Sequence, residues 1–268
     1  MKRQLQMARL CVLAIAAAAA AARAHDTWFE PLRSTPAGHV VFAIGTGNRF
    51  PKYEFPLAYE YLAGSGCRGA GATAAALAHV EDRPASLVVR SATPLNTANG
   101  LTCWAQLAPF NVEVPPEKIE VYLREIQASP ALRATWAAMK ARGLPWRENY
   151  TKYARIELGG SGPRAALPLG MDVLLDNPRQ PIRAGDELGF QVLRDGAPIA
   201  DLPVELIGNL SPLGIWRKTD AEGRVRVTAP LAGRWILRGV DLRVSPKTPD
   251  EWVSWFVTLG FEVSPAKP

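Results

Sequence analysis

Short apolar runs separated by turn residues constrain this chain most, because they recur too closely for helices to form between them. From Leu188 onward, β-forming runs alternate with turns such as Asp195-Gly196 and the stretch TDAEGR at residues 219–224. Strands that repeat about every eight to twelve residues are typical of a β-sandwich, in which two sheets pack face to face. We expect these strands at residues 188–193, 203–207, 224–228, 233–237 and 252–263.

The preceding part of the chain has a mixed pattern. Strand-like runs occupy residues 40–44, 85–90 and 103–107, whereas residues 117–126 and 132–142 carry apolar side chains at helical spacing. Pro115-Pro116 can open the first helix and Gly143 can close the second. The sequence therefore predicts a mainly β protein with a helical insertion in its first half.

The Gly- and Pro-rich stretch at residues 159–168 is the best candidate for a linker. We expect a β-rich domain with the helical insertion at residues 25–165. Residues 166–268 would form the β-sandwich, whose turns and strands resemble those of immunoglobulin-like or transthyretin-like modules.

Residues 1–24 are typical of a cleavable export signal. Basic residues at the start precede an uncharged apolar run at residues 10–22, and Ala22-Arg23-Ala24 supplies small residues for cleavage. The run is shorter than the roughly 20 residues that span a bilayer. We expect a mature chain that begins at His25, is periplasmic or secreted, and has no transmembrane segment.

The net charge of +6, from 31 basic and 25 acidic residues, belongs largely to this signal. Four of the basic residues lie in residues 1–24, which leaves 27 basic against 25 acidic residues in the mature chain. No dense basic stripe with interleaved aromatic residues remains, so nucleic acid is not an expected partner.

Cleavage would also leave two cysteines, Cys67 and Cys103. Exported proteins meet oxidising conditions, so we expect a disulfide between them. Closing this 36-residue separation would stabilise the fold by about 3–4 kcal/mol. Neither cysteine would then be available as a metal ligand or a nucleophile.

The start of the mature chain is the candidate metal site. A terminal His25 carries its own α-amino group beside its imidazole, and together they can chelate nickel, cobalt, copper or zinc. Asp26 could add an oxygen, and His39 or His79 could add a second imidazole. The alternative interpretation is that His39 and His79 are solvated side chains at strand edges and that His25 is only the residue that cleavage exposes.

Other chemistry has weaker support. Residues 64–69, GSGCRG, match the spacing of a dinucleotide fingerprint after a predicted strand at residues 58–62, but the cysteine and the lack of following βαβ units favour glycine turns between strands. No G-x-S-x-G or H-E-x-x-H motif occurs, so we expect no enzyme. Among the tryptophans, Trp146 and Trp216 lie near predicted turns and are the candidates for surface positions.

Four segments resemble a family of two-domain periplasmic proteins, a domain-of-unknown-function family associated with nickel and cobalt uptake. These are HDTWFEP at residues 25–31, GLPWRENYTKYARIEL at 143–158, LGMDVLLDNP at 169–178, and residues 195–238. Many relatives carry a histidine in the glycine-rich segment that here reads GTGNRF, at residues 45–50. The resemblance implies a metal-binding accessory protein and transfers to His25 and Asp26.

The leading hypothesis is therefore a periplasmic protein that binds nickel, cobalt or copper through His25 and presents it to a membrane uptake complex. The alternative is a non-enzymatic exported interaction module that binds a protein or a cell-envelope partner, because sandwich folds do not fix function. A copper oxidase of the histidine-brace kind is a third interpretation, which requires a second histidine that faces His25.

Overall fold

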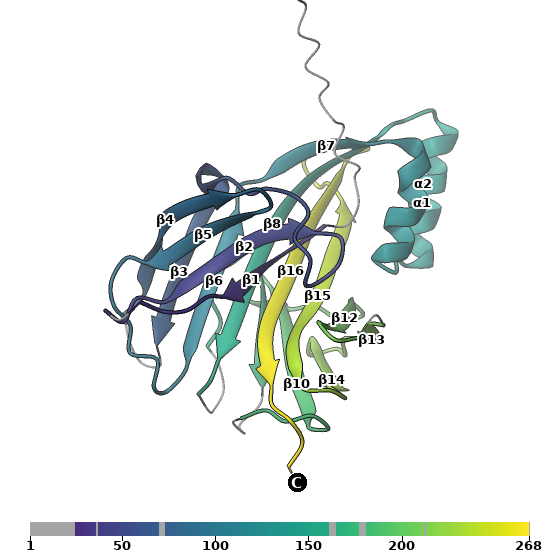
Figure 1. Cartoon of the computed structure of the whole chain (residues 1–268). Coiled ribbons are helices and arrows are strands. Elements are labelled where there is room, and N and C mark those ends of the chain that lie inside the picture. The colour runs from purple at the N-terminus through teal and green to yellow at the C-terminus, as the bar shows by residue number, and fades with distance from the viewer. Residues whose placement is uncertain are drawn as a thin grey trace, which may run out of the picture.

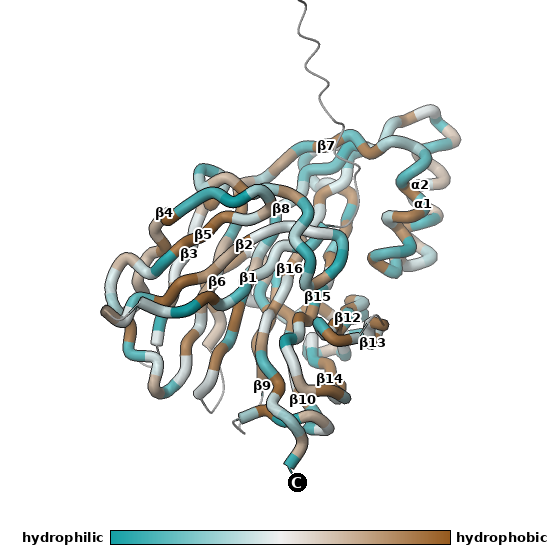
Figure 2. The backbone as a smooth tube through the Cα atoms, viewed as in Figure 1, coloured by the Kyte–Doolittle hydropathy of each residue, from teal (hydrophilic) through white to brown (hydrophobic). Residues whose placement is uncertain are grey.

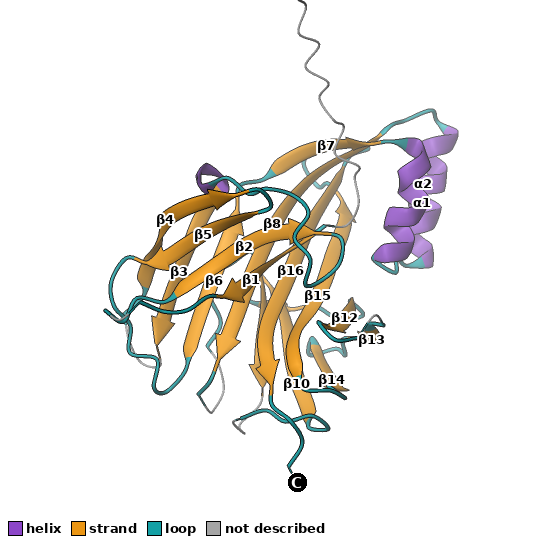
Figure 3. Cartoon of the chain, viewed as in Figure 1, coloured by secondary structure: helices purple, strands orange, loops and turns teal. Residues whose placement is uncertain are grey.

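The computed structural model describes residues 25–35, 37–69, 73–160, 165–176, 181–211 and 213–267. Within these ranges the chain has two α-helices and is otherwise mainly β. Figure 3 shows that strands predominate, so the expected fold class is confirmed. The signal predicted at residues 1–24 lies outside the described residues, as do residues 161–164 of the predicted linker. No helix among the described residues is long and apolar enough to cross a membrane.

The first half contains eight strands and three short helical elements. The strands are β1 (Asp26–Pro31), β2 (Val41–Gly47), β3 (Leu62–Gly69), β4 (Ala75–Arg83), β5 (Ser86–Ser91), β6 (Leu101–Leu107), β7 (Phe110–Val114) and β8 (Trp146–Leu158). The helical elements are the 3-10 turn η1 (Tyr59–Tyr61) and the helices α1 (Pro116–Glu125) and α2 (Pro130–Ala141).

In the second half, the regular elements of the described residues are all strands. They are β9 (Met171–Asp176), β10 (Glu187–Arg194), β11 (Ala197–Pro198), β12 (Pro203–Gly208), β13 (Ile215–Lys218), β14 (Arg224–Thr228), β15 (Gly233–Val244) and β16 (Trp252–Val263). The strands predicted in this half are all present, and β15 extends seven residues beyond the predicted end at residue 237.

One long sheet connects the two halves. Its order is β1-β2-β5-β4-β3-β6-β8-β16-β15-β12-β13, and β7 pairs with β8. The connection is a parallel pair between β8 and β16, in which Trp252 lies opposite Glu148 and Gly260 opposite Ile156. The predicted domain division at residue 165 therefore separates two segments that share a sheet.

The central strands of this sheet are covered on both faces. Side chains alternate between the two faces of a strand, so β8 and β16 contribute to a core on each face. On one face, Tyr153 and Leu259 pack in a core with the smaller sheet of β9, β10, β11 and β14. On the other face, Ala154 packs with residues from β2 and β5, while Trp252 and Phe256 pack with the helices. Figure 1 shows the small sheet, the helices and the folded end of the long sheet around β8 and β16.

The helical insertion forms where the sequence predicts it. Pro116 occupies the first turn of α1, and the Ser129 side chain accepts a hydrogen bond from the Leu132 backbone N–H at the start of α2. The helices bury Ile119, Leu123 and Trp136 among others in a cluster that includes Trp146, which is only 1% exposed. The prediction that Trp146 lies at the surface is therefore wrong, because the helices fold back over the start of β8.

Residues 62–69 form strand β3 rather than a glycine turn, and residues 59–61 form η1 rather than a strand. A Cβ atom at Gly66 would lie 2.8 Å from the ring of Trp104, so this glycine permits close packing between β3 and β6. The glycine-rich motif thus has a packing role that the turn interpretation missed.

The predicted disulfide is confirmed. Cys67 on β3 lies directly opposite Cys103 on β6, with 4.0 Å between the Cα atoms, and the two side chains are fully buried. Figure 2 shows apolar β5 beside the more polar second half of β4. The disulfide cross-links β3 and β6, two neighbouring strands of the long sheet.

Strand β1 begins the long sheet but lies against its centre, in contact with β8 and β16 (Figure 1). The Thr258 hydroxyl donates a 2.5 Å hydrogen bond to the Thr27 carbonyl, which joins β16 to β1 across the fold. This fold-back brings the start of the described chain to the middle of β8.

Candidate functional site

His25 lies at one side of a hollow of about 230 Å³. Its imidazole stacks on Phe55, with 4.1 Å between the ring centroids and 27° between the planes. The remaining lining is mainly apolar and aromatic. It consists of Thr46, Pro56, Leu57, Tyr61, Leu107, Ala108, Phe110, Tyr150 and Lys152.

Segments that are far apart in the sequence line this hollow, which we name the N-terminal hollow. The antiparallel pairing of β1 with β2 places Asp26 opposite Gly47 and Thr27 opposite Thr46, so His25 lies beside the end of β2. Tyr150 and Lys152 are two residues apart on β8 and therefore lie on the same face of that strand. Tyr61 and Phe110, which are 50% and 53% exposed, are the most exposed aromatic residues of the lining.

Lys152 lines the N-terminal hollow, and it is only 8% exposed. Its Nζ atom lies 5.3 Å from the centroid of the Tyr150 ring and 5.7 Å from that of Phe256. Burial lowers the pKa of Lys152 to about 8, against an opposing effect of the Asp26 carboxylate. The ammonium is thus held by aromatic rings in a poorly hydrated position.

Asp26 does not line the hollow. Its carboxylate is buried and lies 2.9 Å from Nη1 of Arg238, whose guanidinium also binds Glu205 at 2.6 Å. Burial raises the pKa of Asp26, although Arg238 and Lys152 favour its charged form. The predicted oxygen ligand is therefore engaged in an ion pair that fixes the start of β1 to β15.

The other two predicted imidazoles lie elsewhere. Successive strand pairs place His79 in line with Pro31, because His79 lies opposite Val89, Val89 opposite Phe42, and Phe42 opposite Pro31. Pro31 ends β1, whereas His25 precedes its first residue. Five residues of a strand span about 16 Å, so His79 lies about that far from His25 along the strand direction. His39 precedes β2 at the same far end, and its Nδ1 lies 2.7 Å from the Ser91 carbonyl oxygen.

The structure therefore brings neither His39 nor His79 to His25. The His79 ring is half-exposed, with Nε2 lying 3.2 Å from the Asp82 carboxylate. No three His, Cys, Asp or Glu side chains come together as a metal-binding group anywhere in the described ranges. A metal site at His25 would need nitrogen from the backbone amine as well as from the imidazole.

Sequence reasoning missed the aromatic lining and Lys152. The alternation of Tyr150 and Lys152 within a strand was a usable signal, because it places a cation next to an aromatic ring on one face. Glu54 was also missed. Hydrogen bonding from the Asn48 backbone N–H lowers the pKa of Glu54, with a smaller contribution from nearby His25.

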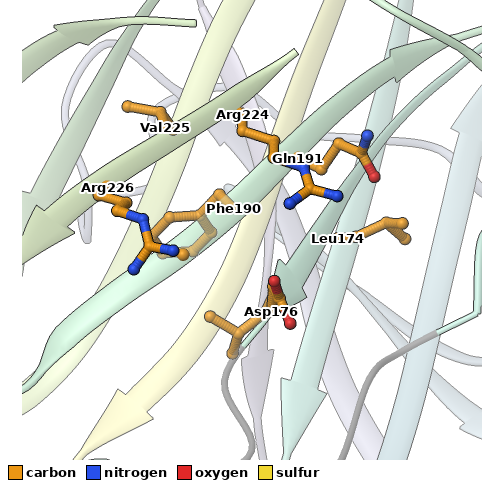
Figure 4. Close-up of a pocket in the computed structure, with 9 residues that line it drawn as sticks. Leu174, Asp176, Phe190, Gln191, Arg224, Val225 and Arg226 are labelled. Carbon is orange, nitrogen blue, oxygen red and sulfur yellow. The ribbon is translucent and has the colours of Figure 1, made fainter. Parts of the chain in front are cut away.

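A second hollow of about 230 Å³ lies on the outer face of the small sheet (Figure 4). Gly189 of β10 lies between Asp176 of β9 and Arg226 of β14, so the missing side chain leaves the depression. Arg226 pairs with Glu187 at 2.8 Å, and both side chains are well exposed. Such a pair contributes at most about 1 kcal/mol, and we interpret this face as solvated surface.

No match is found among curated proteins. A family model described as a domain of unknown function, DUF4198, matches residues 22–240, which include the N-terminal hollow and most of the sandwich. Because the match covers most of the sequence, the chain belongs to the DUF4198 family.

Proposed function

We propose that the mature chain is a periplasmic accessory protein that binds one nickel, cobalt or copper ion at its N-terminus and presents it to a membrane uptake complex. The ligands at the centre of this proposal are the α-amino nitrogen and the imidazole of His25. The observation that carries it is the position of His25, whose ring is stacked on Phe55 beside an open hollow.

The donor chemistry supports these metals. Imidazole and amine nitrogens suit nickel, copper and cobalt better than they suit magnesium or calcium. An α-amino group has a pKa near 8, so proton competition at neutral pH is modest. Stacking on Phe55 restricts the imidazole before a metal arrives, which lowers the entropy lost on binding.

Asp26 contributes to this proposal as an anchor. Its buried ion pair with Arg238 and the bond from Thr258 to the Thr27 carbonyl fix the two residues that follow His25. A ligand on such a fixed strand is positioned more exactly than one on a free terminus. The site therefore combines a rigid support with an open approach for an ion and a receiving protein.

The test is calorimetric titration of nickel, cobalt and copper into chain whose first residue is verified as His25 by mass spectrometry. The proposal expects one-to-one binding that His25→Ala abolishes. His39→Ala and His79→Ala are matched controls, since both lie at the far end of β1, and they should bind as the unmodified chain does.

Binding that persists in His25→Ala, or that disappears in His79→Ala, would contradict the chelate. Absence of binding for every metal would instead favour the interaction-module hypothesis. In that case the exposed Tyr61 and Phe110 at the hollow become the first surface to examine for a partner.

A further inference from the structure

Lys152 has an environment that the metal hypothesis does not use. Its ammonium makes no hydrogen bond or ion pair with another residue in the described part of the chain, and its close neighbours are the rings of Tyr150 and Phe256. The carboxylate that most affects it, Asp26, is bound directly by Arg238. A buried cation with no contacting anion has unused capacity to donate hydrogen bonds.

The N-terminal hollow surrounds this cation with apolar and aromatic groups. No acidic side chain belongs to its described lining. Phe55, Leu57 and Leu107 supply apolar walls, while Tyr61 and Phe110 remain about half exposed at the opening. Sites for small molecules combine such apolar walls with a few polar groups that orient the ligand.

We propose that the N-terminal hollow binds a small organic monocarboxylate with a flat apolar body, whose carboxylate pairs with the Lys152 ammonium. The single cation selects one negative charge, and the aromatic lining selects a flat body. The volume of about 230 Å³ is below the range of about 300–1,000 Å³ that is usual for drug-sized ligands, so the ligand is smaller than these.

Charge complementarity decides between ligand classes here. A neutral aromatic molecule would gain the apolar contacts but leave Lys152 without an acceptor, whereas a cation would be repelled by it. The low pKa of Lys152 agrees with this, because an ammonium that lacks acceptors and water loses its proton more readily. Tyr150 and Tyr61 line the same space, and each carries a hydroxyl that is able to donate a hydrogen bond.

The inference does not rest on the proposed metal function, and the experiment separates the two. Mature protein in the presence of EDTA is titrated with benzoate, and with benzamide, benzylamine and acetate as probes that change the charge or remove the ring. Ligand-observed NMR and calorimetry at pH 7 measure the affinities. We expect saturable one-to-one binding of benzoate that is about tenfold tighter than that of benzamide, with acetate and benzylamine weaker still.

Variants then locate the site. Lys152→Met keeps an unbranched side chain that is one atom shorter and removes its charge, so it should reduce benzoate affinity about tenfold and benzamide affinity less. Lys218→Met is the matched control, because Lys218 is exposed on β13, and should bind benzoate as the unmodified chain does. Lys152→Arg should retain the preference for benzoate over benzamide.

Equal affinities for benzoate and benzamide in the unmodified protein would overturn the inference without any variant, and so would unchanged benzoate binding in Lys152→Met. Reduced benzoate binding in Lys152→Met with nickel binding retained would show that the two proposals stand separately, because Lys152 is not a proposed metal ligand.

Discussion

Glu148 provides the sharpest prediction about stability, because its buried carboxylate serves three donors at once. Tyr122 Oη donates to it at 2.8 Å, Trp146 Nε1 donates at 2.7 Å, and the Ser254 hydroxyl donates to the same oxygen as Tyr122. These residues come from α1, β8 and β16, so the carboxylate joins the helical insertion to the β8–β16 junction. Burial raises the pKa of Glu148, although the three donors favour its charged form.

Two substitutions separate the charge from the hydrogen bonds. In Glu148→Gln the amide oxygen can accept from Trp146, and the amide NH₂ can donate to the Tyr122 and Ser254 oxygens. We expect a change within about 1 kcal/mol at pH 7, since the lost charged bonds are offset by removal of a buried charge. Glu148→Ala leaves the Trp146 N–H without an acceptor and opens a cavity, which should cost about 4 kcal/mol.

The pH dependence follows from the raised pKa of Glu148. The folded state holds the proton more tightly than the unfolded state, so the contribution to stability is complete below about pH 4.5. It is lost as the pH rises through the folded-state pKa. Glu148→Gln should remove this slope. Urea denaturation followed by circular dichroism at pH 5 and pH 7 measures both effects, and equal losses in the Gln and Ala variants at pH 7, or an unchanged slope in Glu148→Gln, would refute the reasoning.

The remaining predictions concern other buried groups. Lys152→Met should raise the free energy of unfolding at pH 7. Because the pKa of Lys152 is lowered from 10.5 to about 8, the unmodified protein should become more stable as the pH rises from about 8 to 10.5. Thermal melts from pH 7 to 10 check whether the variant lacks this gain. Replacing both Cys67 and Cys103 by Ala should destabilise the fold by about 3–4 kcal/mol, and a smaller change in urea denaturation would contradict the cross-link argument. Arg155→Met, which leaves the buried carboxylates of Glu157 and Asp172 without their guanidinium, should cost about 3–5 kcal/mol; unchanged urea denaturation would count against it.

Local pattern and cysteine count were enough to predict much of the fold. The strands at residues 203–207 and 252–263 appear from spacing alone, because apolar runs between turn residues leave few alternatives. The disulfide between Cys67 and Cys103 could be predicted once the predicted signal at residues 1–24 was set aside, since only these two cysteines lie after it.

Long-range contacts could not be predicted from the same information. The parallel pairing of β8 with β16 joins segments about a hundred residues apart, and nothing local marks either strand as its partner. Trp146 is buried because the helices fold back over it, a tertiary effect that its position near a turn conceals.

The candidate site, like the fold, could be predicted from the sequence only in part. Residue type and the position after the predicted signal led to the hypothesis of a site at His25, but the register between β1 and β2 places His39 at the other end of the strand. The burial of Lys152 depends on the return of β1 to the centre of the sheet. Chemical identity could thus be inferred from sequence, whereas the grouping of side chains required the fold.

The central claim is that the α-amine and the imidazole of His25 act together on one metal ion. The most direct test compares nickel affinity of chain that begins at His25 with that of chain carrying one additional alanine before it. The extension keeps the imidazole and moves the amine. We expect the extension to reduce nickel affinity about 100-fold or more, since a linked second ligand contributes by effective concentration. Equal affinity in the two proteins would contradict the terminal chelate and assign the metal to other ligands.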